Sequence, residues 1–298
     1  MKFTIIIPHY NSFEKLGRLL KTIPKSKKIE IIVIDDKSDE ENLLKEFKLK
    51  YNYVNFFTNT SLNKGAGAAR NIGLKRAKGS WIIFADADDY FLEGAFDIFE
   101  KNKNSNVDLI YFYTTSRLEK TYEISDRHIV FNKLVDKFLE NDEEKELRYR
   151  FLPPWGKMIK RSVINENKIF FEEIMYSNDI GFSIKLSHAA KEIKAIKKEV
   201  YCITRDNKTL STNLSEKAFD SRYGAVKRAN LFLRDKLLKK YQIWTIGYLV
   251  KSYKFGLKKF FSIFWDILIH KQKIFPGSLL KDCKLIYEKS VNFKDKKY

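Results

Sequence analysis

The sequence predicts an α/β fold in which a mostly parallel sheet is covered by helices on both faces. In the first third of this 298-residue chain, short apolar runs alternate with segments that have helical spacing. These runs are almost continuously apolar, which is typical of parallel strands buried on both faces. Polar clusters directly follow three of the runs. Because ligands bind beyond the carboxyl ends of such strands, we expect the clusters to meet at one rim.

The first ninety or so residues contain four predicted strands and the helices between them. The strands are the apolar runs at 3–7, 29–34, 53–57 and 81–85. The intervening helices are expected at 13–23, at about 40–50, and in the Gly- and Ala-rich segment 63–78, which begins as a loop. The order strand, helix, strand is the one that builds a parallel sheet.

The pattern after residue 100 is less regular. Further strands are expected at 107–113 and 194–204, and a helix at 180–193. The charged segment 120–150 is expected to be helical in part, and helices follow from about residue 216. The sequence shows no internal repeat and no low-complexity linker.

Positive charge is concentrated at the end of the chain. Residues 221–298 contain 19 Lys and Arg against 5 Asp and Glu, and so hold +14 of the formal net charge of +19. A basic segment of this kind indicates an anionic partner, either a membrane surface or a nucleic acid. The sequence has no RRM, KH or zinc-finger signature, and we therefore expect no nucleic-acid partner.

The cysteines and the first residues favour a cytoplasmic protein. Cys202 and Cys283 are far apart and form no CxxC pair, so we expect two buried thiols in a reducing compartment. The apolar run at 3–7 is shorter than the core of a signal peptide. No stretch approaches the eighteen or so consecutive apolar residues of a spanning helix.

Acidic residues follow the fourth strand, in the sequence DADDY at 86–90. Carboxylates at positions i and i+2, here Asp86 and Asp88, can lie around one hard cation. Mg²⁺ and Mn²⁺ prefer oxygen ligands, usually a few carboxylates together with phosphate oxygens. The alternative is a solvated turn or a helix N-cap.

A second acidic cluster, VIDDKSDE at 33–40, follows the second strand. Asp36 can accept hydrogen bonds from a ribose or a base, and the alternative is that the cluster only caps the next helix.

The segment 63–80 has the residues of a phosphate-binding loop. Its glycines permit close approach of the backbone, and Lys64 and Arg70 can meet phosphate charge at the start of a helix. The segment lacks the third glycine of a dinucleotide fingerprint and follows the third strand rather than the first, which argues against a Rossmann dehydrogenase.

Taken in order, these segments resemble the family 2 glycosyltransferases, which are inverting enzymes with the GT-A fold. The resemblance rests on IIIPHYN at 5–11, VIDDKSDE at 33–40, NKGAGAARNIGL at 63–74 and GSWIIFADADD at 79–89. It implies that Pro8, His9 and Tyr10 line the pocket of a nucleobase, that Asp36 binds this base, and that Arg70 lies near the diphosphate. It further implies that Asp86 contacts the ribose and the metal, and that Asp88 binds the metal.

The second half resembles the same family more loosely, through LPPWGKMIKRSVINENKIFF at 152–171 and MYSNDIGFSIKL at 175–186. Many members have Glu-Asp in the latter segment, and the Asp is the general base. This chain has Asn178-Asp179. The resemblance implies that Asp179 is the base. The alternative is that Asp179 caps the helix that begins near Ile180, and it can do both.

The resemblance also implies an organisation and an activity. Residues 1–100 would form the nucleotide-sugar half, 101–215 the acceptor half of the same GT-A domain, and 216–298 a basic helical region. We expect a Mn²⁺- or Mg²⁺-dependent inverting transfer of a hexose or N-acetylhexosamine. The donor would be a nucleotide-diphosphate sugar, a UDP-sugar in our expectation. The acceptor would be a glycan hydroxyl in bacterial lipooligosaccharide, capsule or polysaccharide assembly.

Two alternatives to this activity remain open. The net charge favours a nucleic-acid-binding protein, and the absent Glu before Asp179 favours a pseudo-enzyme that binds a nucleotide-sugar without transferring it.

The segment 251–269 predicts one amphipathic helix. On a helical projection its lysines fall on one side, and they are Lys251, Lys254, Lys258 and Lys259. Most of its large apolar residues fall on the other side, and they are Tyr253, Leu257, Phe260, Ile263, Phe264, Ile267 and Leu268. Such a helix suits the surface of an anionic bilayer. We therefore expect a protein on the inner face of the cytoplasmic membrane, where it can reach a lipid-linked acceptor. The alternative is that the apolar side packs on the catalytic domain.

Overall fold

The computed structural model describes residues 1–205 and 213–275, and the chain forms two compact units, Met1–Asn213 and Leu214–Tyr298. Cys202 is a buried free thiol as expected, whereas Cys283 and the basic residues after 275 lie outside the described residues.

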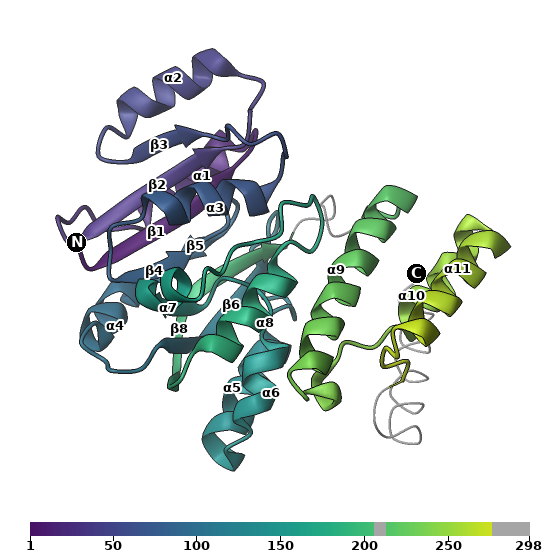
Figure 1. The fold of residues 1–298 in the computed structure, drawn as a ribbon. Coiled ribbons are helices and arrows are strands. Elements are labelled where there is room, and N and C mark those ends of the chain that lie inside the picture. The colour runs from purple at the N-terminus through teal and green to yellow at the C-terminus, as the bar shows by residue number, and fades with distance from the viewer. Residues whose placement is uncertain (206–212, 276–298) are drawn as a thin grey trace. The chain divides into compact units, whose positions relative to one another are not determined.

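An eight-stranded sheet forms the centre of the first unit (Figure 1). Its strands are β1 (Phe3–His9), β2 (Ile29–Asp35), β3 (Asn55–Thr58), β4 (Trp81–Phe84), β5 (Tyr90–Phe91), β6 (Leu109–Leu118), β7 (Lys157–Lys160) and β8 (Ile193–Arg205). They are ordered β3-β2-β1-β4-β7-β6-β8-β5. The four strands from β3 to β4 are parallel, β7 is antiparallel to β4 and β6, β6 and β8 are parallel, and β5 is antiparallel to β8. The mostly parallel sheet predicted from the apolar runs is therefore confirmed.

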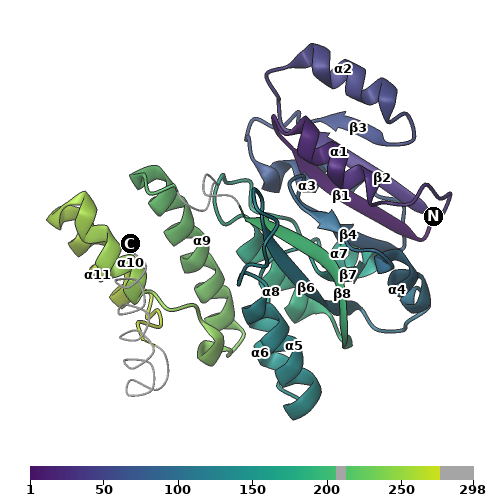
Figure 2. The same ribbon diagram turned by 180° about the vertical axis from the view of Figure 1, so that it is seen from behind.

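Helices cover both faces of this sheet. They are α1 (Phe13–Lys21), α2 (Glu41–Lys50), α3 (Ala66–Arg76), α4 (Ala95–Asn102), α5 (Ile129–Asn141), α6 (Glu144–Arg150), α7 (Arg161–Glu166) and α8 (Asp179–Ala189). Figure 1 shows α3 in front of β1 and β2, and Figure 2 shows α1 on the opposite face. A methyl group added at Gly73 of α3 would lie 2.5 Å from a side-chain carbon of Ile6, so only a glycine lets α3 approach β1 this closely.

The sheet brings the predicted polar clusters to one rim. β1 and β2 run in register to their last residues, His9 and Asp35, whose side chains approach to 3.2 Å. The Asp86 side chain, just beyond β4, contacts Arg70 near the start of α3. Since β1 is parallel to its neighbours β2 and β4, the three clusters lie at the same edge of the sheet, as expected.

Two strands of the sheet show where the structure departs from the sequence prediction. The strand expected at 107–113 continues to Leu118 as β6, because it pairs along its length with β8 and the pairing crosses two irregularities. The two-residue strand β5 was not predicted, because it is too short to show a period and forms only by pairing with Tyr201 and Cys202.

The second unit is described from Leu214 to Phe275 and is helical. It contains α9 (Glu216–Asp235), α10 (Ile246–Ser252) and α11 (Leu257–Ile269), with 3-10 turns η2 (Lys239–Tyr241) and η3 (Tyr253–Phe255). Phe219 and Tyr223 of α9 form a small buried core with Ile263 and Ile267 of α11. In the part of the chain that the structure describes, we find no helix with the length and apolar character needed to cross a bilayer.

The prediction of one continuous helix over 251–269 is wrong. The chain turns at Gly256, whose φ of 96° lies in the left-handed region that glycine adopts without strain. Lys251 and Lys254 therefore precede the break, and Lys258 and Lys259 follow it on α11. Helical periodicity alone does not reveal this break, because the apolar spacing continues across the glycine.

Candidate active site

The loop after β4 is fixed by its third aspartate. Asp89 is buried, and its Oδ1 accepts a 2.7 Å hydrogen bond from the backbone N–H of Thr204 on β8. The backbone carbonyl of Asp88 accepts hydrogen bonds from the Thr204 hydroxyl, at 2.6 Å, and from the Arg18 guanidinium. The Asp86 and Asp88 side chains remain partly exposed. Asp89 thus anchors the loop, and Asp86 and Asp88 are left to meet a ligand.

The two remaining carboxylates fit a divalent cation. Burial, followed by the negative charge of Asp86, raises the pKa of Asp88 above its ordinary value. A cation would relieve this crowding of like charge. Mg²⁺ is commonly held by one or two carboxylates together with substrate phosphates. No group of three or more His, Cys, Asp or Glu that could hold a metal occurs within residues 1–205 and 213–275, so phosphate oxygens would have to complete the coordination.

Arg70 joins this loop to the acceptor-side segment. Its guanidinium is buried and donates one hydrogen bond of 2.5 Å to Asp86 Oδ1 and another of 2.9 Å to Asn178 Oδ1. The guanidinium also lies over the Phe171 ring, 5.2 Å from its centroid. Arg70 Nε is buried and has no hydrogen-bond partner among the described residues. Arg70 therefore contacts both predicted halves of the site at once.

Asn178 is a site residue that the sequence analysis did not assign. It stands where many members of the resembled family have Glu, and its amide oxygen, instead of a carboxylate, accepts the hydrogen bond from Arg70. The neutral partner leaves more of the guanidinium charge uncompensated. The only signal in the sequence was the departure from Glu-Asp itself.

Asp179 is the first residue of α8, next to the helix N-terminus. Asn178 occupies the N-cap position, and its side chain makes no capping hydrogen bond. The alternative that Asp179 serves as the N-cap is therefore not what the structure shows. Burial raises the pKa of the Asp179 carboxyl above its ordinary value, although the charge of Arg70 and the backbone amide of Asp179 act against this. A carboxylate with a raised pKa that feels the charge of Arg70 can take up a proton.

On the predicted nucleobase side, Tyr10 is the exposed residue. Its side chain is 45 % exposed, and the Lys64 ammonium lies 3.7 Å from the centroid of its ring. The Tyr10 hydroxyl donates a 3.2 Å hydrogen bond to Asp39. Tyr10 thus presents an aromatic face on which a base can stack, and Lys64 covers that face in this structure.

Asp36 is buried and closes the loop that follows β3. Its Oδ1 accepts a hydrogen bond of 2.5 Å from Asn59, and its Oδ2 accepts one of 2.7 Å from the backbone N–H of Gly65. Each carboxylate oxygen retains a second lone pair, so Asp36 can still accept from a base. The sequence did not reveal this loop-closing role, because Asn59 and Gly65 are brought to Asp36 only by the fold.

Pro8 and His9 are buried rather than exposed to the rim. His9 Nδ1 contacts Asp35 at 3.2 Å, and His9 Nε2 accepts a hydrogen bond from the backbone N–H of Ser12. Both ring nitrogens are thus engaged within the protein. Of the three residues predicted to line the nucleobase pocket, Tyr10 alone presents an exposed side chain.

The nucleotide-side loop and the acceptor-side segment are in close contact. Glu173 accepts hydrogen bonds from Ser61 at 2.8 Å, and from Asn63 and Asn71 at 3.3 Å each. A methyl group added at Gly67 would lie 2.2 Å from the backbone oxygen of Glu172. Glu173 could not be recognised from the sequence, because an acidic residue in a loop gives no sign of its partners.

Comparison with known proteins gives a consistent result. A profile described as Glycosyl transferase family 2 matches residues 4–167, more than half of the chain. The chain is 32% identical over 225 residues to a poly(ribitol-phosphate) beta-glucosyltransferase of Bacillus spizizenii, covering 71% of this chain and 34% of that protein. It is 27% identical over 189 residues to a GalNAc(5)-diNAcBac-PP-undecaprenol beta-1,3-glucosyltransferase of Campylobacter jejuni, covering 62% of this chain and 59% of that protein.

Among solved structures, residues 1–349 of Staphylococcus aureus TarS in complex with UDP-GlcNAc superimpose with a TM-score of 0.64 at 21% sequence identity. The match covers 88% of this chain and 76% of that one. It confirms the expected GT-A fold. The chain spans only about a third to three fifths of the length of the two sequence relatives.

Proposed function

The chain belongs to glycosyl transferase family 2, and we propose that it transfers a hexose or N-acetylhexosamine from a nucleotide-diphosphate sugar to a glycan hydroxyl with inversion. The observation that carries the proposal is the Arg70 bridge. One guanidinium contacts Asp86, on the metal and diphosphate side, and Asn178, which directly precedes the proposed base Asp179.

Different residues of the site act on different parts of the donor and the acceptor. Tyr10 and Asp36 bind the nucleoside end of the donor, and Lys64 lies near its diphosphate. Glycosyl transfer develops negative charge on the leaving diphosphate, and Arg70 is placed to meet part of it. A Mn²⁺ or Mg²⁺ ion held by Asp86 and Asp88 would supply the remaining positive charge.

Asp179 completes the reaction on the acceptor side. Its carboxylate takes the proton of the attacking hydroxyl while the new bond to the anomeric carbon forms and the bond to the diphosphate breaks. A single displacement of this kind inverts the anomeric centre. The helix N-terminus at Asp179 and the charge of Arg70 both favour the ionised carboxylate and act against burial, which raises its pKa.

We propose that the acceptor belongs to a bacterial cell-surface glycan and that the donor is a UDP-sugar. Two relatives are named for glucosyl transfer, one to poly(ribitol-phosphate) and one to a glycan on PP-undecaprenol. The structural neighbour was solved with UDP-GlcNAc. A glycan that grows on a polyprenyl carrier would place this protein at the inner face of the cytoplasmic membrane.

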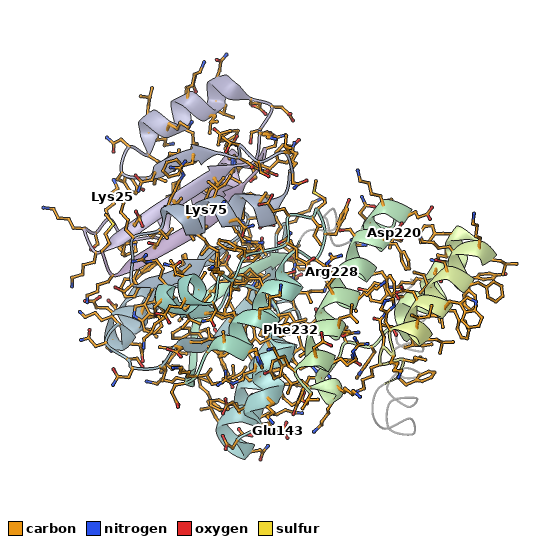
Figure 3. The ribbon with its side chains drawn as sticks, in the orientation of Figure 1. Lys25, Lys75, Glu143, Asp220, Arg228 and Phe232 are labelled. Carbon is orange, nitrogen blue, oxygen red and sulfur yellow. The ribbon has the colours of Figure 1, made fainter. Side chains whose placement is uncertain are left out.

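The second unit supports such a position through a surface that overlaps only in part with the one predicted. Lys259 does not face outward, because it pairs with Glu216 at 3.1 Å and with Asp220, labelled on α9 in Figure 3, at 2.6 Å. Ile263 and Ile267 are buried against α9, so part of the predicted apolar side is buried within the second unit.

A second apolar stripe lies on the exposed side of α11. Its members are 42 to 60 % exposed, and they are Leu257, Phe261, Trp265 and Leu268. Lys258 on the same helix, and Lys251 and Lys254 just before it, are exposed. An apolar stripe with lysines beside it suits an anionic bilayer, whereas a second copy of the chain would bring like charges together. We therefore propose that this stripe, which shares Leu257 and Leu268 with the predicted apolar side, contacts lipid.

The experiment that tests the function is a donor screen. Purified protein is incubated with UDP-, GDP- and dTDP-sugars and a polyprenyl-diphosphate-linked glycan, and nucleotide release and product anomer are measured. We expect release from UDP-sugars that depends on acceptor and on Mn²⁺ or Mg²⁺, with an inverted product. Donor binding without transfer would favour the pseudo-enzyme. A salt-dependent gel shift with DNA or RNA, without donor binding, would favour the nucleic-acid alternative.

A further inference from the structure

Arg18, on α1, bonds to the loop that carries the proposed metal ligands. Its guanidinium donates a hydrogen bond to the backbone carbonyl of Asp88. Its two terminal nitrogens also donate to the two carboxylate oxygens of Glu119, at 2.9 and 3.0 Å. Glu119 directly follows β6 and lies 101 residues from Arg18 in the sequence. One side chain of α1 thus ties the loop after β4 to the loop after β6.

The backbone of residues 86–89 is held from two sides. On the β8 side, the Tyr201 hydroxyl accepts a 2.8 Å hydrogen bond from the backbone N–H of Asp86. The Thr204 hydroxyl, also on β8, donates at 2.6 Å to the carbonyl of Asp88. On the α1 side, Arg18 donates to this same carbonyl. Because the carbonyl shares its residue with a proposed metal ligand, a shift of the carbonyl would also turn the Asp88 carboxylate.

The charge of Arg18 is balanced by Glu119. The two side chains are 24 and 16 % exposed, so their ion pair is partly shielded from water. Burial acts to raise the pKa of Glu119, but the hydrogen bond and the charge of Arg18 lower it below its ordinary value, and Glu119 is therefore ionised at neutral pH. An unbalanced guanidinium beside Asp88 would oppose the binding of a divalent cation. With Glu119 in place, Arg18 can hold the carbonyl without that penalty.

We propose that Arg18 is a positioning residue for the divalent cation, because its contacts with Glu119 and the Asp88 carbonyl hold the Asp88 carboxylate where it can bind Mn²⁺ or Mg²⁺. This inference rests on the proposed metal role of Asp86 and Asp88. Groups that orient metal ligands without touching the metal typically contribute about 10–100-fold to metal affinity. The guanidinium suits this task, because its fork reaches three oxygen atoms on two loops, whereas an ammonium has a single nitrogen.

The first test measures how much Mn²⁺ tightens the binding of UDP. The Kd of UDP is determined by titration calorimetry in EDTA and in saturating Mn²⁺, for wild type and Arg18→Met. We expect the variant to lose at least about tenfold of the gain that Mn²⁺ gives wild type. If Arg18 acted only through its charge, the gain would instead increase, because Glu119 would be left unbalanced. A gain in Arg18→Met that equals or exceeds that of wild type would overturn the proposal.

Two further variants separate geometry from charge. Arg18→Lys keeps the charge but is shorter and lacks the fork, and it serves as the test if Arg18→Met does not fold. We expect the Mn²⁺ gain to fall in Arg18→Lys as well, and an unchanged gain would overturn the proposal. Lys15→Met is the matched control, because Lys15 lies 3.9 Å from the same Glu119 carboxylate and its loss removes the same charge. The gain should not fall in Lys15→Met, and an equal loss there would overturn the assignment to Arg18.

A second readout needs neither metal nor nucleotide. Hydrogen–deuterium exchange in EDTA is compared between wild type and Arg18→Lys. The backbone amides of Asp86 and Asp89 are bonded to Tyr201 and to the carbonyl of Asp86, and we expect both to lose protection in the variant while β4 keeps its own. Unchanged exchange at these two amides would overturn the inference alone. A wild-type UDP affinity that ignores Mn²⁺ would reject the metal role in the proposed function, and the inference with it.

Discussion

Replacing Asp179 by Asn should abolish most of the activity and at the same time stabilise the fold. Asn keeps the shape of the side chain but has no basicity, and a general base typically contributes about 10²–10⁴-fold. At about 1.36 kcal/mol for each factor of ten, the barrier should rise by about 2.7–5.4 kcal/mol. Donor affinity should change little, because no donor-binding role is assigned to Asp179.

The stability change follows from the sign of the pKa shift. Burial raises the pKa of Asp179 in the folded protein, so the ionised carboxylate is less favourable there than in the unfolded chain. The resulting destabilisation is absent below the unfolded pKa and is fully present once the pH exceeds the folded pKa. Asn does not ionise, so Asp179→Asn should raise Tm at pH 7. This gain is reduced by the lost attraction to the α8 N-terminus, about 0.3–1 kcal/mol, and should vanish near pH 3.

The assay combines two measurements on each variant, namely kcat from acceptor-dependent nucleotide release and Tm from scanning calorimetry at pH 7 and pH 3. Asp97→Asn is a matched control, because Asp97 lies exposed in the first turn of α4. It loses the same kind of helix attraction without touching the site, and should lower Tm slightly and leave kcat unchanged. A kcat for Asp179→Asn within tenfold of wild type, or a lower Tm at pH 7, would refute the reasoning.

Three further predictions follow from the contacts of the site and of α11. Asp88→Ala should remove metal-dependent transfer and leave Tm close to that of wild type, and full wild-type activity in EDTA would contradict a metal role. Gly67→Ala should destabilise the first unit by about 1–3 kcal/mol in chemical denaturation, because its methyl group would lie 2.2 Å from the Glu172 carbonyl oxygen; an unchanged midpoint would show that the segment yields without cost. Phe261→Ser combined with Trp265→Ser should release the protein from anionic vesicles in sedimentation at low salt without changing transfer to a soluble acceptor, and wild-type protein that ignores such vesicles would rule out the lipid surface.

The parts of the fold that depend on local pattern could be predicted from the sequence. Continuous apolar runs such as 29–34 and 81–85 can be buried only between two helical layers. Asp36 and Asp86 directly follow these runs, so their place at the carboxyl ends of the strands could be predicted. The parts that depend on long-range contacts could not be predicted. The partners of Asp36 come from a loop more than twenty residues away, and a lysine at the start of a short strand gives no sign that it is buried.

The second unit shows a different limit of sequence reasoning. Helical projection assumes an unbroken helix, so it assigned Lys259 to a solvent face, whereas the turn at Gly256 and the packing of α11 give it acidic partners on α9. Periodicity also shows that α11 has apolar residues around much of its circumference without showing which of them α9 covers. The tertiary contacts of Ile263 and Ile267 determine which apolar residues of α11 are covered by α9.

If the donor base stacks on Tyr10 as proposed, it must replace the contact that Lys64 makes with the Tyr10 ring. A nucleobase that stacks on Tyr10 must first displace the ammonium that lies 3.7 Å from its ring centroid, at a cost of about 0.5–1 kcal/mol for a cation–π contact near the surface. A free nucleoside gives the displaced lysine no new partner, whereas a nucleoside diphosphate brings its own anion. Lys64 can therefore lower the affinity for nucleosides relative to nucleoside diphosphates without contacting the base.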